Sequence, residues 1–314
     1  MGIDATTVDR GLVVNIGAKW GGHRSGPDRD VAWELVAGNK NLSIVGFEAD
    51  NKTYHTTRRV LELSTMGKFR GANLHAGRAT LVNEAVSPRT LCDRLQSAGV
   101  RSARAQSSSA SAAPSISSAP PLLLLKVDID SMDVPVTSAA LRCGLAPKLV
   151  YVEFNQWLHR PLKFAALAPG SVSDPQPPTN ASASSTSVAA AAATAAAAAA
   201  PRYGQGYSGS NRLWPCMGAS LAMWVRTLHH QGYTLMTTDG NSNALFVPSA
   251  AHPRLTSSRL DCHDYATNGS RRVRRFARLK GFEPELPLAE YVDAARRVID
   301  GRCRATNTPY TLSW

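Results

Sequence analysis

Short apolar runs alternate with longer amphipathic segments through the first half of the chain. The apolar runs are rich in Val, Ile and Leu, which is typical of strands buried on both faces of a sheet. We predict strands at 12–17, 42–50, 78–86, 122–130 and 148–155. Helical patterns follow the first three of them, at 29–37, 54–66 and 88–99. Strands and helices in this order favour a parallel sheet that is covered on both faces.

The second half of the chain predicts a different ending. Residues 219–233 repeat apolar side chains on one helical face, and Gly232 is a natural stop. The runs TLMTT and ALFVP then predict two strands joined by the turn DGNSN. Residues 285–299 predict one more amphipathic helix. The expected fold class is therefore α/β: a Rossmann-like doubly wound sheet, mostly parallel, with an antiparallel terminal hairpin and a C-terminal helical extension.

Two stretches interrupt this pattern, at 101–121 and 168–210. Both are rich in Ser, Ala and Pro and have few bulky apolar side chains, so burial cannot offset the entropy of ordering them. We interpret them as disordered, low-complexity insertions in one domain at 11–248. Residues 249–314 then form a basic, partly helical extension.

Charge and cysteines narrow the class of protein. The formal net charge is +12, and the densest basic run is RRVRRFARLK at 271–280. A solvated helix face is one explanation of this run; contact with a nucleic acid or an anionic membrane is the alternative. The five cysteines are widely spaced without a CxxC pair, which predicts reduced thiols and a cytoplasmic location. No apolar run approaches the ~18 residues of a spanning helix, so we expect no membrane span.

Polar residues gather where the predicted strands end. In a parallel sheet, ligands bind beyond these carboxyl ends, at the point where the strand order reverses. Gly17 and Gly21 flank a tight turn, but Lys19 stands where a dinucleotide fingerprint needs its second glycine. A pyrophosphate is therefore disfavoured there. Glu48, at the tip of the second strand, is placed to accept hydrogen bonds from ribose hydroxyls.

Six segments in order resemble the FkbM-type S-adenosylmethionine-dependent methyltransferases. They are VVNIGAKWGG, GFEAD, LVNEAVS, LLKVDIDSMDVPV, VYVEFN and GASLAMWVRTLHHQGYTLMTTDGNSNALFV, and they span about residues 11–248 apart from the insertions. The resemblance implies that the cofactor is S-adenosylmethionine. Its binding residues would be Asn15, Gly17, Ala18 and Gly21 at the turn, Glu48 at the ribose and Glu84 near the adenine. Lys19, Trp20 and Ser131 depart from the family pattern.

The acids of the fourth strand carry the expected chemistry. Asp128 and Asp130 share one face, because strand residues two apart point the same way, and the resemblance makes them the catalytic pair. Glu153 and Asn155 share a face on the next strand. Together with Asp128 and Asp130 they resemble the Asp/Asp/Asn cluster that holds Mg²⁺ in catechol-type methyltransferases, where the metal acidifies the acceptor hydroxyl. The alternative is structural: Asp128 caps the sheet, and Asp130 and Asp133 are solvated or bind loop amides.

Three functions are consistent with these patterns. The first is an O-methyltransferase acting on a small-molecule or glycan hydroxyl, an acceptor class that comes from the family resemblance. The second is a nucleic-acid methyltransferase anchored by residues 271–280. The third is a non-catalytic binding module that kept the fold and lost the cofactor through Lys19 and Trp20.

Overall fold

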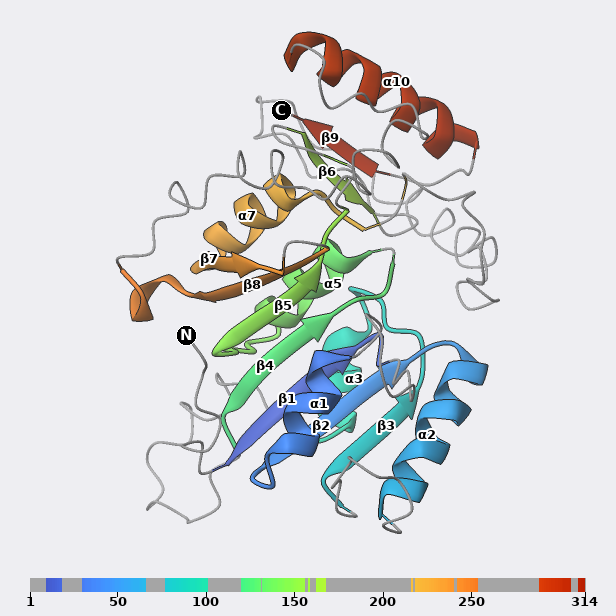
Figure 1. Ribbon diagram of the computed structural model, residues 1–314, viewed down its shortest axis with the longest axis vertical. Coiled ribbons are helices and arrows are strands. Elements are labelled where there is room, and N and C mark those ends of the chain that lie inside the picture. The colour runs from blue at the N-terminus through green and yellow to red at the C-terminus, as the bar shows by residue number, and fades with distance from the viewer. Residues whose placement is uncertain are drawn as a thin grey trace, which may run out of the picture.

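A seven-stranded mixed sheet runs through the molecule (Figure 1). The computed structural model describes residues 10–18, 30–65, 77–100, 120–130, 132–155, 158, 162–167, 216, 218–239, 242–253, 288–305 and 310–313. In spatial order the strands are β3 (Ala79–Asn83), β2 (Leu42–Glu48), β1 (Gly11–Ile16), β4 (Leu122–Val127), β5 (Leu149–Glu153), β8 (Asn243–Pro248) and β7 (Tyr233–Thr238). In this sheet β8 runs antiparallel to β5 and β7, and the pairs from β3 to β5 are parallel. The predicted fold class is confirmed.

Helices cover both faces of this sheet. On one face, α1 (Val31–Gly38) packs against β1, β2 and β4, and α2 (Asn51–Thr65) adds Leu61. On the other face lie α3 (Leu91–Ser97), α5 (Asp133–Arg142) and α7 (Leu221–His230). Successive residues of β1 serve opposite cores, since Val13 packs on the α1 side and Val14 on the α3 side.

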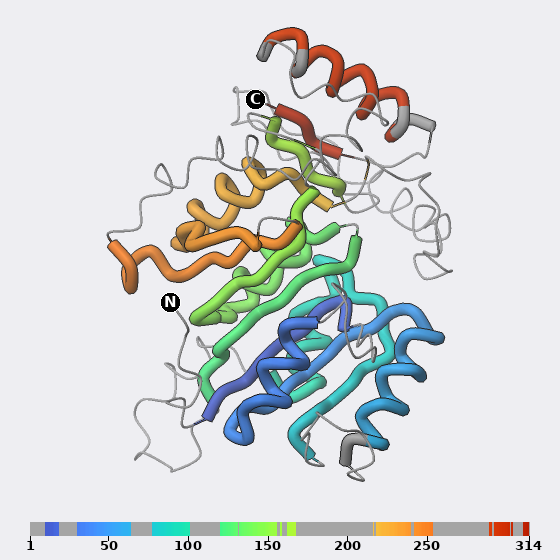
Figure 2. Tube along the Cα trace, viewed as in Figure 1, coloured from blue at the N-terminus to red at the C-terminus, as the bar shows by residue number. Residues whose placement is uncertain are grey.

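The strand order reverses beside β1. Figure 2 shows the chain passing from β1 outward through β2 to β3 and then crossing back to β4, on the other side of β1. The connections that follow β1 and β4 therefore leave the sheet in opposite directions. The carboxyl ends of two such neighbouring strands are the usual position of a ligand in an open α/β sheet.

Two parts of the fold are absent from the sequence prediction. The helix α5 was hidden by Pro135 and by the β-branched residues around it, although proline is tolerated in a first helical turn. A separate two-stranded sheet pairs β6 (Lys163–Ala166) with β9 (Tyr310–Ser313). These strands are short and lie far apart in the chain, so no local pattern could pair them.

The C-terminal segment packs on this small sheet. The helix α10 (Leu288–Ala305) buries Ala295 and Ile299 in a cluster with Leu162 and Phe164. The end of the predicted extension thus contacts residues of the predicted 11–248 domain, while the boundary at 248 stays a prediction. A short 3-10 turn, η2 (Ser249–Ala251), follows β8.

The cysteine prediction is wrong for four of the five residues. Cys92 is joined to Cys143, and Cys216 to Cys303, with Cα–Cα distances of 5.5 and 5.4 Å. Widely spaced cysteines look unpaired in the sequence because the fold, and not the spacing, brings them together. Disulfides are typical of oxidising compartments, so the predicted cytoplasmic location loses the support of reduced thiols.

Several sequence predictions lie outside the described residues. These are Gly21, Lys19 and Trp20 of the turn, Ser131, the basic run 271–280, Cys262, and both insertions except Pro120 and Pro121. Within the described part of the chain, no helix combines the length and apolarity needed to cross a membrane.

A glycine is required where the ends of β1 and β4 lie side by side. Gly17 has a φ of +84°, and a Cβ there would lie 1.8 Å from the backbone oxygen of Asp128. The turn is held by hydrogen bonds from the amides of Gly17 and Ala18 to the carbonyl of Phe47, both 3.0 Å. Gly17 therefore allows close packing of two strands, in addition to any role at a ligand.

Gly17→Ala should destabilise the protein far more than Gly99→Ala. Gly99 has a similar φ of +81° but open space around its Cβ, so alanine there costs only the left-handed backbone, about 1–2 kcal/mol. At Gly17 the clash adds to that cost, and we expect more than about 3 kcal/mol in total. Urea denaturation measures both; equal losses would contradict the clash.

Loss of the Cys216–Cys303 disulfide should destabilise the chain by about 2–5 kcal/mol. The bond closes a sequence separation of 87 residues, so it restricts the unfolded chain strongly. Because either serine variant breaks the same bond, Cys216→Ser/Cys303→Ser should be little less stable than either single variant. Urea denaturation measures the loss, and additive single effects would argue against the bond.

Candidate active site

Four strand ends meet at one edge of the sheet. Ile16 pairs with Phe47 and Val127, and Val127 pairs with Val152. Continued by one residue, this register places four residues in a row on one face. They are Glu48, Gly17, Asp128 and Glu153. The structure thus brings together three predicted site residues and adds Glu153.

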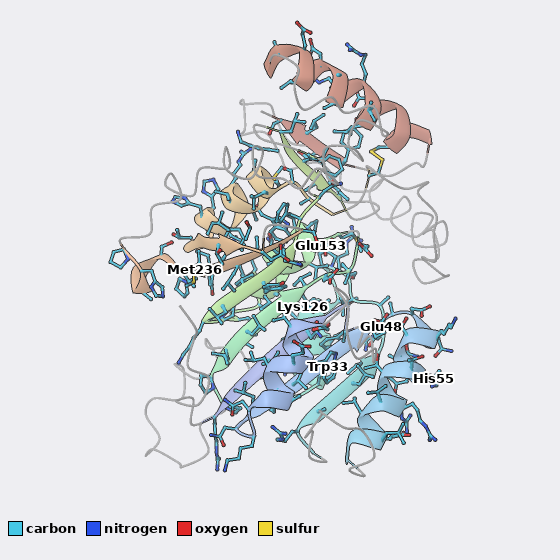
Figure 3. All side chains as sticks on the ribbon, viewed as in Figure 1. Trp33, Glu48, His55, Lys126, Glu153 and Met236 are labelled. Atoms are coloured by element: carbon cyan, nitrogen blue, oxygen red, sulfur yellow. A yellow bond between two sulfur atoms is a disulfide. The ribbon has the colours of Figure 1, made fainter. Side chains whose placement is uncertain are left out.

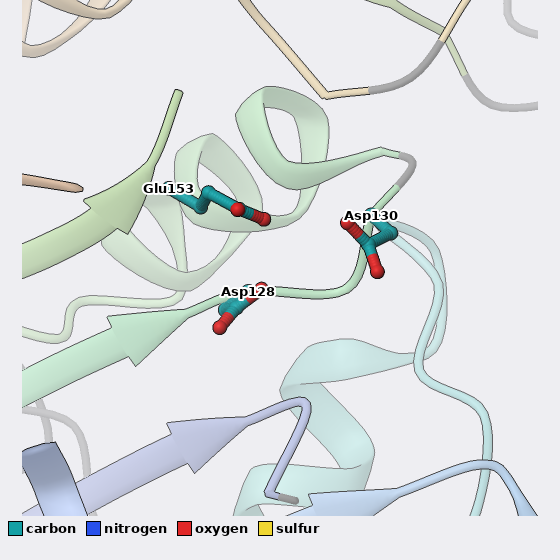
Figure 4. A group of neighbouring side chains, drawn as sticks. All are labelled: Asp128, Asp130 and Glu153. Atoms are coloured by element: carbon teal, nitrogen blue, oxygen red, sulfur yellow. The ribbon is translucent and has the colours of Figure 1, made fainter. Parts of the chain in front are cut away.

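Three carboxyl groups form a cluster at the Asp128 end of this row (Figure 4). Asp128 follows β4, Asp130 lies in the turn beyond it, and Glu153 ends β5. The prediction that Asp128 and Asp130 share a strand face is wrong, because β4 ends at Val127 and a turn brings the two acids together. One oxygen of each lies within 4.8 Å of the others. Asp130 is exposed and has a φ of +56°, a conformation that aspartate tolerates better than most residues.

The turn that carries Asp130 is anchored by Asp133. The backbone amide of Ile129 donates to Asp133 Oδ1 at 2.8 Å, and the Asp133 side chain is buried at the start of α5. This is the structural role expected of an acid bound to a loop amide. Asp133 therefore shapes the turn that carries Asp130, and its charge also contributes to the raised pKa of Glu153.

Glu153 has an unusual protonation state. Burial, together with the negative charges of Asp128 and Asp130, raises the pKa of Glu153 to about 10. At neutral pH its carboxyl group is protonated and can share its proton with Asp128. The sequence grouped Glu153 with Asn155 beside the acids of the fourth strand, and the β4–β5 register places it next to Asp128.

A buried lysine places a positive charge next to Asp128 and Asp30. Lys126, 4% exposed, lies on β4 two residues before Asp128. Its Nζ is 3.0 Å from Asp128 Oδ2 and 3.3 Å from Asp30 Oδ2. Burial by itself would lower the pKa of Lys126, but the two carboxylates raise it above its usual range. Lys126 therefore stays positively charged on β4, two residues before Asp128.

Asn15 belongs to the same network. Its Nδ2 donates to Asp30 Oδ2 at 2.9 Å, and Asp30 Oδ1 caps α1 by accepting from the amide of Ala32. Asn15 is completely buried, and within the described residues no donor reaches its Oδ1. That acceptor oxygen could serve a donor of a bound molecule.

The other predicted cofactor residues differ in what they contact. Figure 3 labels Glu48 at the end of β2, where it is 8% exposed and its Oε1 accepts from the amide of Asp50 at 2.8 Å. Ala18 is buried beside the turn. Glu84 forms a salt bridge of 2.6 Å with Arg94 of α3, so its carboxylate already has a cationic partner.

Asn155 has a clear backbone role. Its amide donates to the carbonyl of Ala219 at 2.6 Å, which ties the end of β5 to the residues before α7. Ser220 then holds β6, accepting from the amide of Phe164 at 3.0 Å and donating to the carbonyl of Leu162 at 2.6 Å. The part of Asn155 in a metal site stays a prediction.

Comparison with known proteins reveals only distant similarity. No protein-family model and no curated protein matches the chain. One similar solved structure is the N-terminal domain of EvdMO1 with SAH bound, at 10% identity and a TM-score of 0.33, covering 76% of this chain and 74% of that one.

Two further structures are similar to the same degree. The CurJ carbon methyltransferase has 10% identity and a TM-score of 0.33, covering 76% of this chain and 48% of that one. The glycopeptide N-methyltransferase MtfA complexed with sinefungin has 11% identity and a TM-score of 0.31, covering 75% and 78%. Function therefore has to be argued from the site itself.

Glu153→Gln should stabilise the protein increasingly as the pH rises from 5 to 9. An unfolded glutamate ionises above about pH 4.3, whereas the folded carboxyl stays protonated until about pH 10. The wild type therefore loses stability relative to the neutral glutamine across this window. Thermal denaturation with a chelator present measures the difference, and Glu62→Gln on exposed α2 is the control. A constant difference between pH 5 and 9 would contradict the raised pKa.

Proposed function

We propose that the protein is an S-adenosylmethionine-dependent methyltransferase that methylates oxygen on a small-molecule or glycan hydroxyl. The observation that carries the proposal is the row of Glu48, Gly17 and Asp128 where the strand order reverses. The motifs that resemble FkbM-type enzymes fall on this row. The acceptor class rests on that resemblance.

The chemistry of the row suits an adenosine-bearing cofactor without a pyrophosphate. A carboxylate has two oxygens that can each accept more than one hydrogen bond, so Glu48 can bind ribose hydroxyls while it accepts from the Asp50 amide. The buried Oδ1 of Asn15 suits a donor such as an ammonium group. Bound there, S-adenosylmethionine supplies an electrophilic methyl group on a sulfonium.

The acids of the cluster then have separate tasks. Methyl transfer to a hydroxyl breaks a C–S bond, forms a C–O bond and releases the hydroxyl proton, so a base must lie at the acceptor. Asp130 is exposed in the turn after β4 and takes this proton. Asp128, held by Lys126, orients the reacting groups. Glu153 is protonated at neutral pH and acts as a hydrogen-bond donor.

Mg²⁺ is a second way to use the same oxygens. Asp128 and Asp130 present hard oxygen ligands that a divalent cation prefers, and Glu153 lies close enough to join them. A cation there would displace the proton of Glu153 and bind the acceptor oxygen. The basic run of the nucleic-acid alternative lies outside the described residues, so no observation favours that function.

Calorimetric titration with S-adenosylmethionine tests the proposal. We expect binding by the wild type, weakened roughly 10- to 100-fold in Glu48→Ala, because charge-assisted hydrogen bonds to the ribose are lost. Glu62→Ala on α2 is the matched control and should bind normally. Absence of binding by the wild type would refute the enzyme and leave a non-catalytic module. Tighter binding with Mg²⁺, abolished in Asp130→Asn, would support the metal.

A further inference from the structure

Lys126 is a buried cation in a position that an apolar residue would suit. Its strand neighbours Leu125 and Val127 are fully buried in the core. Burying an ammonium requires desolvation, and apolar residues often replace buried ion pairs without loss of stability. Stability alone therefore does not explain a lysine here.

The contacts of Lys126 join two parts of the site that the chain keeps apart. On one side, Nζ contacts Asp128 at the end of β4; on the other, it contacts Asp30 at the start of α1. Asp30 is also bound to Asn15 of β1, the register partner of Lys126. One ammonium thus connects β1, β4 and α1.

The start of α1 matters because Asp30 is bound from two strands. Asn15 of β1 donates to Asp30 Oδ2 at 2.9 Å, and Lys126 Nζ of β4 lies 3.3 Å from the same oxygen. Beyond Asn15, the amides of Gly17 and Ala18 donate to the carbonyl of Phe47, so the end of β1 is held as well.

We propose that Lys126 is a positioning residue, which fixes Asp30 and its partner Asn15 against Asp128 so that the cofactor-binding groups of β1 and β4 keep one spacing. The inference rests on the proposed function, because it assigns Lys126 a role toward that cofactor. Lys126 acts through Asp30 and Asp128. It does not touch the cofactor or the acceptor itself.

The test compares binding of S-adenosylhomocysteine with stability in the full-length chain. Lys126→Met should raise the dissociation constant at least tenfold, and Lys126→Arg, which keeps the charge, should raise it less. The control is Arg78→Met, because Arg78 donates to the carbonyls of Asn39 and Leu42 beyond the other end of α1. This control should lower the melting temperature without changing the dissociation constant.

A further variant guards against misfolding of Lys126→Met. Asp30→Asn/Lys126→Met removes opposite charges together and keeps an oxygen to cap α1, and it should also bind at least tenfold more weakly than the wild type. Wild-type binding by either methionine variant would overturn the inference. So would weakening in Arg78→Met in proportion to its lost stability. If the wild type itself does not bind, the proposed function fails, and this inference fails with it.

Discussion

The contact between β1 and β4 at Gly17 and Asp128 determines the geometry of the site. Because the glycine lies against the Asp128 backbone, the two strands end side by side and their connections leave in different directions. The acid at the end of β4 is thereby brought next to the turn after β1. A side chain at position 17 would separate them, and the row from Glu48 to Glu153 depends on their contact.

Electrostatics explains how several acids can share this edge. Asp30 and Asp128 are balanced by Lys126, a cation enclosed by the sheet and α1. Asp128, Asp130 and Glu153 remain too close for all three to ionise at low cost, so Glu153 at the end of β5 retains a proton. The site is locally acidic although the whole chain carries a net charge of +12.

The C-terminal segment packs on β6, the strand that follows β5 in the chain. The strand β9 pairs with β6, and α10 packs on the apolar cluster that contains Phe164 of β6. The Cys216–Cys303 disulfide joins α10 to the segment before α7. The hydrogen bond from the Asn155 amide to Ala219 connects that region back to the end of β5, and the hydrogen bonds of Ser220 connect it to Leu162 and Phe164 at β6. The C-terminal segment is thus linked by short contacts to the strand that carries Glu153.

The amino-acid sequence by itself determined the order of the main elements and the polar character of the strand ends. Apolar runs and helical periodicity are local properties, so β1 to β5, the terminal hairpin and the positions of Glu48, Asp128 and Asp130 could be predicted. Only the tertiary structure decided which of these groups meet. The β4–β5 register brings Glu153 next to Asp128, and the close contact between the ends of β1 and β4 requires Gly17. Packing of distant segments pairs four cysteines and joins β6 to β9. These are contacts between distant residues, and the local pattern of side chains carries no record of such distances.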